Sequence, residues 1–198
     1  MMIAELKPFF GSYSKAQEIL FLLHDAKEVV RQGFYDEELP PLESFCKENR
    51  LCLVKSTFKV VLNDNSAYSN QGLRLPASDP QPGMYFVYIS KDQQKAYLAS
   101  YYELTENHQE LGLLLGYPAC CILFFIQNFH EQNTNLELKP INLYTNLTQR
   151  ENDVVLLSHF PCSSDCQESI ALGKKYLEVL QQVDKARAEK IKAILTVR

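Results

Sequence analysis

The spacing of hydrophobic residues in the first quarter of the chain predicts two helices. Over residues 12–32 apolar side chains recur every three or four positions, which is the period of one face of a helix. A serine at the start of this segment can cap the helix, and Gly33 can end it. A shorter helix is predicted over residues 40–48, because proline is favoured in the first turn and this segment begins with two prolines.

The middle of the chain has the composition and the alternation that are typical of strands. Residues 51–62 are rich in β-branched and aromatic side chains and predict one strand. Residues 63–83 are rich in Asn, Ser, Asp, Pro and Gly, which predicts a long loop with a short strand near residues 73–75. Residues 84–90 and 95–100 predict an antiparallel hairpin. We therefore expect an antiparallel sheet beside the N-terminal helices.

The pattern in the second half of the chain favours helices. Residues 104–115 predict a helix that ends at Gly116, and residues 118–132 predict a second helix that begins with a proline. A long last helix is predicted over residues 164–195, where apolar residues fall on one face. The fold class is therefore α+β: N-terminal helices with a small antiparallel sheet, followed by a helical C-terminal half.

The length fits one compact domain over residues 1–198, which we divide into a helix-and-sheet part (1–100) and a helical part that carries most cysteines (101–198). Hydrophobic residues make up 46% and charged residues 22%, as in ordinary globular proteins. No apolar run has the length of a membrane span, and the N-terminus lacks the features of a signal peptide. We therefore expect a cytoplasmic protein that does not enter a membrane.

The charge of the chain is unevenly distributed. The formal net charge is −4, yet the segment from Gly173 onward has seven basic and three acidic residues, a net +4. A solvated terminal helix with charge pairs explains this segment, and a docking surface for nucleic acid or an acidic partner is the alternative. No partner is otherwise indicated. The seven glycines form no phosphate-binding loop, and the metalloprotease and serine-hydrolase motifs are absent from the sequence.

Four of the six cysteines lie where helices are predicted to begin. Cys120 and Cys121 form one pair, and Cys162 and Cys166 form the other. The unpaired N–H groups and the positive dipole end at a helix start favour the thiolate, which is the form that binds metals or attacks electrophiles. His159 precedes Cys162 by three residues, so that His-x-x-Cys-x-x-x-Cys forms a compact group of donors.

In a reducing compartment, cysteines are thiols or metal ligands more often than disulfides. Our candidate metal ligands are Cys120, Cys121, His159, Cys162 and Cys166. Three thiolates with one imidazole suit zinc, and three or four thiolates also suit an iron–sulfur cluster. Adjacent residues on a helix point about 100° apart, so we expect that only one of the vicinal pair is a ligand. Burial at a helix–helix contact and metal-free thiol chemistry both explain the same cysteines as well.

The segments Gly-Tyr-Pro-Ala-Cys-Cys (116–121) and His-Phe-Pro-Cys-Ser-Ser-Asp-Cys (159–166) resemble an uncharacterised prokaryotic family with the pattern Gly-Tyr-Pro-x-Cys-Cys, then His-x-Pro-Cys-Ser-x-x-Cys. The resemblance covers about the second half of the chain and implies that both cysteine clusters belong to one unit. It implies no reaction. Our leading hypothesis is a cytoplasmic metal- or iron–sulfur-binding protein. The alternatives are a thiol-based redox enzyme or sensor and a non-enzymatic interaction module with structural cysteines.

Overall fold

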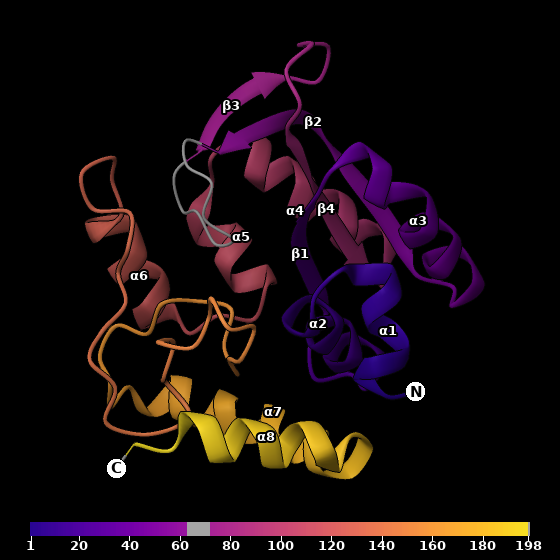
Figure 1. The fold of residues 1–198 in the computed structure, drawn as a ribbon. Coiled ribbons are helices and arrows are strands. Elements are labelled where there is room, and N and C mark those ends of the chain that lie inside the picture. Colours follow the sequence, from indigo (N-terminus) through magenta and orange to yellow (C-terminus); the bar gives the residue numbers. More distant parts are fainter. Residues whose placement is uncertain (63–71, 198) are drawn as a thin grey trace.

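The computed structural model describes residues 1–62 and 72–197 (Figure 1). The first half of the chain forms α1 (Ile3–Phe10), α2 (Tyr13–Leu23), β1 (Val29–Phe34), the short 3-10 helix η1 (Asp36–Glu38), α3 (Leu39–Glu48), β2 (Cys52–Leu62), β3 (Gly72–Pro76) and β4 (Met84–Ser90). The second half forms α4 (Gln93–Leu104), α5 (His108–Leu114), α6 (Ala119–Asn128), α7 (Gln167–Val183) and α8 (Lys185–Leu195).

The predicted α+β fold is confirmed. Within the described residues the strands form one antiparallel sheet in the order β1-β4-β2-β3. The helix predicted over 40–48 and the strands predicted over 51–62, near 73–75 and over 84–90 are all present, with bounds that differ by a residue or two. Residues 63–71, the first part of the predicted long loop, lie outside the described residues.

Helices cover both faces of the sheet. Neighbouring residues of a strand point to opposite faces, so each strand contributes apolar side chains to both layers of helices. Val30 and Val87 pack with α1, α2 and α3 in the large core cluster. Val29 and Tyr88 point the other way and pack against Ala99 of α4 in a second cluster, which also includes residues of α5. The sheet is therefore the middle layer between the N-terminal helices and α4–α5 (Figure 1).

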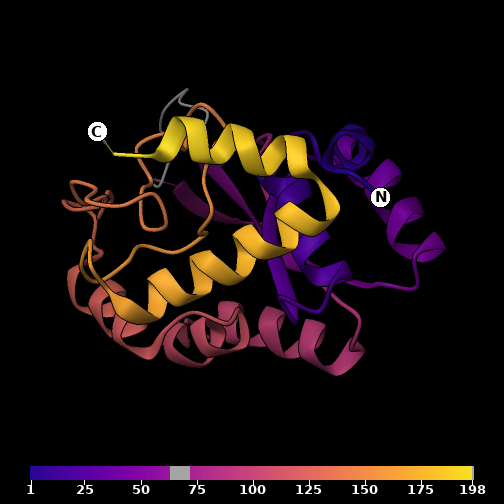
Figure 2. The same cartoon turned by 90° about the horizontal axis from the view of Figure 1, so that it is seen from below.

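The last two helices pack against the N-terminal helices, as Figure 2 shows from below. The ring of Phe21 in α2 stacks on Tyr176 in α7 with the ring centroids 4.3 Å apart. The N–H of Ile3 donates a hydrogen bond to the Asp184 carboxylate at 3.0 Å. The large core cluster accordingly contains residues from both ends of the chain. The division into parts at residue 100 stays a prediction.

Two predicted elements were wrong, the first because pairing with a distant strand decides its structure and the second because of a local helix cap. The helix predicted over 12–32 ends at Leu23, the chain turns at Asp25 with a φ of +57°, and β1 follows. The apolar spacing of this segment also fits a strand, and pairing with β4 selects the strand. The strand predicted over 95–100 belongs to α4, whose start is capped by the Asp92 carboxylate through the N–H groups of Gln94 and Lys95.

The C-terminal half is less regular than predicted. The helix predicted over 164–195 is two helices, since the chain bends at Asp184 and the side chain of this residue caps α8 through the Arg187 N–H. α7 begins at Gln167 rather than at residue 164. The helices predicted over 104–115 and 118–132 are shorter, and residues 129–166 contain no helix or strand of the fold. In the described part of the chain no helix has the length and apolar character needed to cross a bilayer.

Candidate metal centre

The four cysteines that begin the two predicted helices come together in the structure. The sulfurs of Cys120, Cys121, Cys162 and Cys166 all lie within 4.8 Å of one another. The Sγ–Sγ distances are 3.8 Å between Cys120 and Cys121, and 3.7 Å from Cys166 to each of these two. Cys121 and Cys166 are buried, with exposed fractions of 2% and 7%, whereas Cys120 and Cys162 are half-buried. The cluster therefore joins two segments that are about 40 residues apart.

Both members of the vicinal pair reach the cluster, although their side chains diverge around the helix. Pro118 precedes the first turn of α6, and Cys120 and Cys121 lie within that turn. Side chains on a helix tilt toward its N-terminus, so the two sulfurs in a first turn converge in front of the helix end. Sequence reasoning considered the angle around the axis and missed this tilt along the axis.

The second segment is a tight turn that other residues of the irregular region hold in place. Cys166 is the N-cap residue of α7, and its N–H donates to the Ser163 carbonyl at 3.2 Å. The Ser164 carbonyl accepts two hydrogen bonds of 2.7 Å, from the Asn142 amide and the Thr145 hydroxyl. Ser164 itself does not cap the helix, because its hydroxyl donates to the Lys139 carbonyl. These contacts fix the two cysteines against the start of α6.

Hydrogen bonds to Cys121 extend the site into a chain of buried polar groups. The Cys121 sulfur accepts from the Cys162 N–H at 3.3 Å and lies 3.2 Å from the Ser169 hydroxyl. The Ser169 hydroxyl in turn lies 2.9 Å from His159 Nε2. Ser169 was not predicted from the sequence, although it follows Cys166 by three residues, the spacing that places two side chains on one helix face.

These contacts divide the thiols into different protonation states. Burial raises the pKa of the Cys121 thiol to about 12, against the lowering by the hydrogen bonds from Ser169 and Cys162. Burial also raises the pKa of Cys120. At Cys166 burial acts in the same direction, but hydrogen bonds from the Ser169 hydroxyl and N–H, and from the neighbouring thiols, lower the pKa to about 7. Because cysteines bind metal ions as thiolates, the lowered pKa of Cys166 favours binding of a cation.

His159 lies beside the cluster and is not one of the four donors that converge. Its side chain is 6% exposed, and its ring lies 5.0 Å from the Tyr117 ring. Burial, and then the positive charges of Lys27 and Arg150, lower the pKa of His159 to about 3. The imidazole is therefore neutral, and it contacts the cluster through Ser169. A group in this position can orient a metal ligand through a hydrogen bond.

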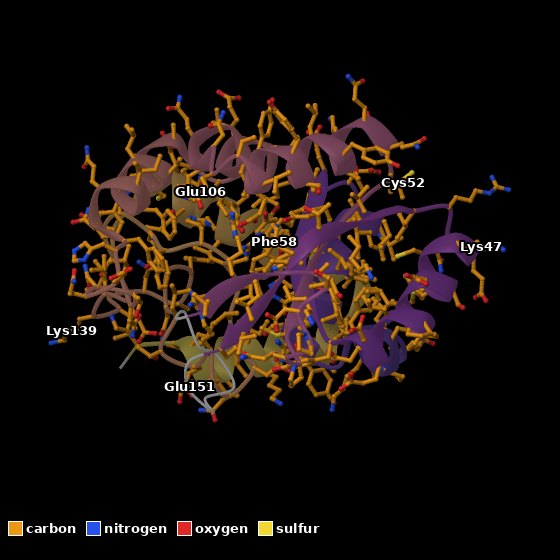
Figure 3. The ribbon with its side chains drawn as sticks, turned by 90° about the horizontal axis from the view of Figure 1, so that it is seen from above. Lys47, Cys52, Phe58, Glu106, Lys139 and Glu151 are labelled. Carbon is orange, nitrogen blue, oxygen red and sulfur yellow. The ribbon has the colours of Figure 1, made fainter. Side chains whose placement is uncertain are left out.

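The other two cysteines are far from this site. Figure 3 shows Cys52 near Lys47, at the opposite end of the molecule from Lys139, whose carbonyl contacts the cysteine turn. Cys46 is buried, as expected for a small core residue, and burial, followed by the charge of Glu43, raises its pKa to about 12. Cys52 is half-buried.

A cavity of about 470 Å³ lies next to the cysteine cluster. Its wall includes Cys121 and His159, so that the two features share residues. The wall also includes Arg31 of β1, Arg74 of β3 and Glu103 of α4. No signal in the sequence indicates these three residues, because strand pairing and helix packing bring them together from distant positions.

Comparison with known proteins identifies a family for the second half of the chain. A family model described as "Protein of unknown function (DUF483)" matches residues 96–196, about half of the chain. The matched region contains both cysteine segments, His159 and Ser169, whereas Arg31 and Arg74 lie outside it. No curated protein and no solved structure matches the chain.

Proposed function

The chain belongs to the DUF483 family of proteins of unknown function, and we propose that it is a cytoplasmic zinc-binding protein. In this proposal the thiolates of Cys120, Cys121, Cys162 and Cys166 hold one structural zinc ion. His159, the fifth candidate ligand predicted from the sequence, orients Cys121 through the Ser169 hydroxyl. The distances among the sulfurs carry the proposal.

These distances match the geometry of a single tetrahedral ion. Four sulfurs that each lie about 2.3 Å from zinc at tetrahedral angles are about 3.8 Å apart. The three distances among Cys120, Cys121 and Cys166 are 3.7, 3.7 and 3.8 Å. Three sulfurs at this spacing, with the Cys162 sulfur within 4.8 Å of them, are typical of a site for zinc or for a single iron ion.

The same spacing argues against the larger iron–sulfur clusters. In a [4Fe–4S] cluster each thiolate binds a different iron, so the four sulfurs must be separated by the width of the cluster. Here all four sulfurs lie within 4.8 Å of one another. A single ion therefore fits the group better than a cluster does.

A zinc ion at this site would act as a cross-link, because a four-thiolate ion has no open position for a substrate. It would connect α6 to the turn before α7 across residues 129–166, which contain no helix or strand of the fold. Closing a loop of about 40 residues lowers the conformational entropy of the unfolded chain, which raises its free energy by about 4 kcal/mol. We therefore expect zinc to stabilise the C-terminal half.

Metal analysis of the protein purified without oxygen tests the proposal. We expect about one zinc ion per chain, lost in Cys162→Ser and retained in Cys52→Ser, whose cysteine lies outside the cluster. Removal of zinc by a chelator should lower the free energy of unfolding, because the free energy of zinc binding to the folded chain is lost. A protein purified without metal, or one with the visible absorption and acid-labile sulfide of an iron–sulfur cluster, would overturn the zinc proposal.

The lowered pKa of Cys166 supports a second candidate, a thiol-based redox sensor. Its sulfur lies 3.7 Å from the Cys120 sulfur. Oxidation of these two thiols to a disulfide would transfer two electrons and two protons to an oxidant such as hydrogen peroxide, which becomes water. Quantitative disulfide formation in the metal-free protein, with full reversal by a thiol reductant, would favour this function.

A further inference from the structure

We propose that the cavity beside the cysteine cluster binds a small organic anion with an apolar body. This inference goes beyond the zinc site and does not depend on it, because the cavity shares only part of its wall with the cluster. Its volume of about 470 Å³ lies within the range of small-molecule sites.

The anionic group is assigned from the charges in the wall. Three arginines, Arg31, Arg74 and Arg150, line the cavity together with one buried carboxylate, Glu103. Arg31 and Arg74 both form ion pairs with Glu103, and Arg74 also pairs with the exposed Glu106 at 3.4 Å. The wall thus presents three guanidinium groups, each rich in N–H donors, in a protein whose net charge is −4. Such a site attracts anions.

The three arginines are held in place by aromatic rings. The guanidinium carbon of Arg31 lies 3.8 Å from the ring centroid of Phe86, and that of Arg150 lies 4.7 Å from the ring centroid of Phe160. Arg74 lies over the ring of Phe58 at 4.1 Å. Stacking of this kind orders the planar fork that binds carboxylates and phosphates through paired hydrogen bonds.

The apolar body is assigned from the helices on the other side of the cavity. Their lining residues are mainly aliphatic and aromatic, and include Leu111, Leu115, Ile122, Phe125 and Phe129. The wall thus combines the charged groups of β1, β3 and α4 and Arg150 with the apolar residues of α5 and α6. A ligand that fills this space has an anionic end toward the sheet and a hydrophobic end toward the helices.

His159 supplies an additional polar group in the wall. Its Nε2 contacts the Ser169 hydroxyl, and its Nδ1 is buried and has no hydrogen-bond partner in the described part of the chain. When the Ser169 hydroxyl donates to the Cys121 sulfur, Nε2 must carry the proton of the neutral ring, and Nδ1 is then an acceptor. A hydroxyl or N–H group on the ligand would satisfy this acceptor.

Three small probes with the same ring and different charge test the proposal: phenyl phosphate, benzoate and benzylamine. Titration of the full chain, in its metal-loaded form, should detect binding of the two anions and none of the cation. Arg74→Gln should weaken phenyl phosphate binding at least tenfold, because the cavity loses one of its three guanidinium groups. The variant should fold, since Arg74 is half-exposed and its loss leaves the core intact. Lys47→Gln, which removes a positive charge far from the cavity, should change the affinity less than twofold.

A second measurement covers the case in which Arg74→Gln does not fold. In the unaltered protein, phenyl phosphate should shift the amide resonances of α5, α6 and residues 158–160 more than those of α3. Equal binding of the anions and the cation, or resonance shifts spread over the whole protein, would overturn the proposal. Repetition after zinc removal separates it from the zinc proposal: failure of zinc binding alone leaves the anion-binding result unaffected.

Discussion

Replacement of Gly112 by alanine tests how α5 and α6 form the wall of the cavity. Gly112 is a buried residue of α5, and it faces Ile122, which directly follows the vicinal cysteines in α6. A Cβ atom at position 112 would lie 2.7 Å from Cγ1 and 2.9 Å from Cδ1 of Ile122, with Cγ2 at 3.3 Å. Such contacts require one of the two helices to move.

Two opposite effects determine the result of Gly112→Ala. Alanine favours the helix over glycine by about 1 kcal/mol. Extra volume in a packed interior costs about 1 to 3 kcal/mol. Cγ1 and Cγ2 of Ile122 are both bonded to Cβ, and a β-branched side chain in a helix has one strongly preferred rotamer. Ile122 therefore cannot relieve these contacts by changing its rotamer. The difference between the two effects is a fall of up to about 2 kcal/mol in the free energy of unfolding.

Urea denaturation in two backgrounds checks this reasoning, with zinc held at one saturating concentration. In the Ile122→Ala background all three close contacts are absent, and Gly112→Ala should then stabilise the protein by about 1 kcal/mol. The sign of the effect should thus reverse between the backgrounds, which is a coupling between neighbouring residues. The reasoning is refuted if Gly112→Ala stabilises the unaltered protein, or if its effect is the same in both backgrounds.

Three further predictions concern buried polar groups. Ser169→Ala should weaken zinc binding about 10- to 100-fold, measured by competition with a chelator, because Cys121 loses its hydrogen bond; an unchanged affinity would count against this role. In the metal-free protein, the rate at which iodoacetamide alkylates Cys166 should rise with pH around a midpoint near 7, since the pKa of this thiol is about 7. Mass spectrometry of the adducts measures this rate, and a midpoint far from 7 would contradict the prediction. Lys27→Met should lower the free energy of unfolding by about 3 to 5 kcal/mol, because Glu18 then keeps a largely buried charge without its cation. Urea denaturation measures this loss, and most of it should be recovered in the double variant Lys27→Met/Glu18→Leu.

Elements with strong local signals could be predicted from the sequence. The prolines that begin α3, and the β-branched and aromatic residues of β2 and β4, determine their structure over a few neighbouring residues. The Asp92 cap of α4 is also a local signal, and attention to it would have distinguished the start of a helix from a hairpin turn.

Elements whose structure depends on distant partners could not be predicted. Val29 and Val30 are both completely buried, one on each face of the sheet. Two consecutive apolar residues fit a buried helix and a buried strand equally well, and pairing with β4 determines which forms. The break at Asp184 has a similar cause, because its carboxylate accepts from the N–H of Ile3 at the other end of the chain.

The cysteines of the candidate site were recognisable because their residue type and position at helix starts are local properties. Their convergence was only inferred, and the participation of both Cys120 and Cys121 was not expected. The cavity was not visible in the sequence, since its arginines are single residues, two on separate strands and Arg150 in the irregular region. Residue chemistry therefore indicated the candidate metal centre, whereas topology alone brings the arginines of the cavity together.

The shared wall of the two sites leads to a last prediction. A zinc ion with four thiolates has no free position, so an anion in the cavity would contact the protein and not the metal. Cobalt in place of zinc tests this, because the visible absorption of Co²⁺ depends on the number and type of its ligands. Saturation with phenyl phosphate should leave the cobalt spectrum unchanged. A spectrum that changes to that of a five-coordinate ion, or of one that has lost a sulfur ligand, would mean that the anion binds the metal. In that case the centre would be open to substrates, and its role would be catalytic rather than structural.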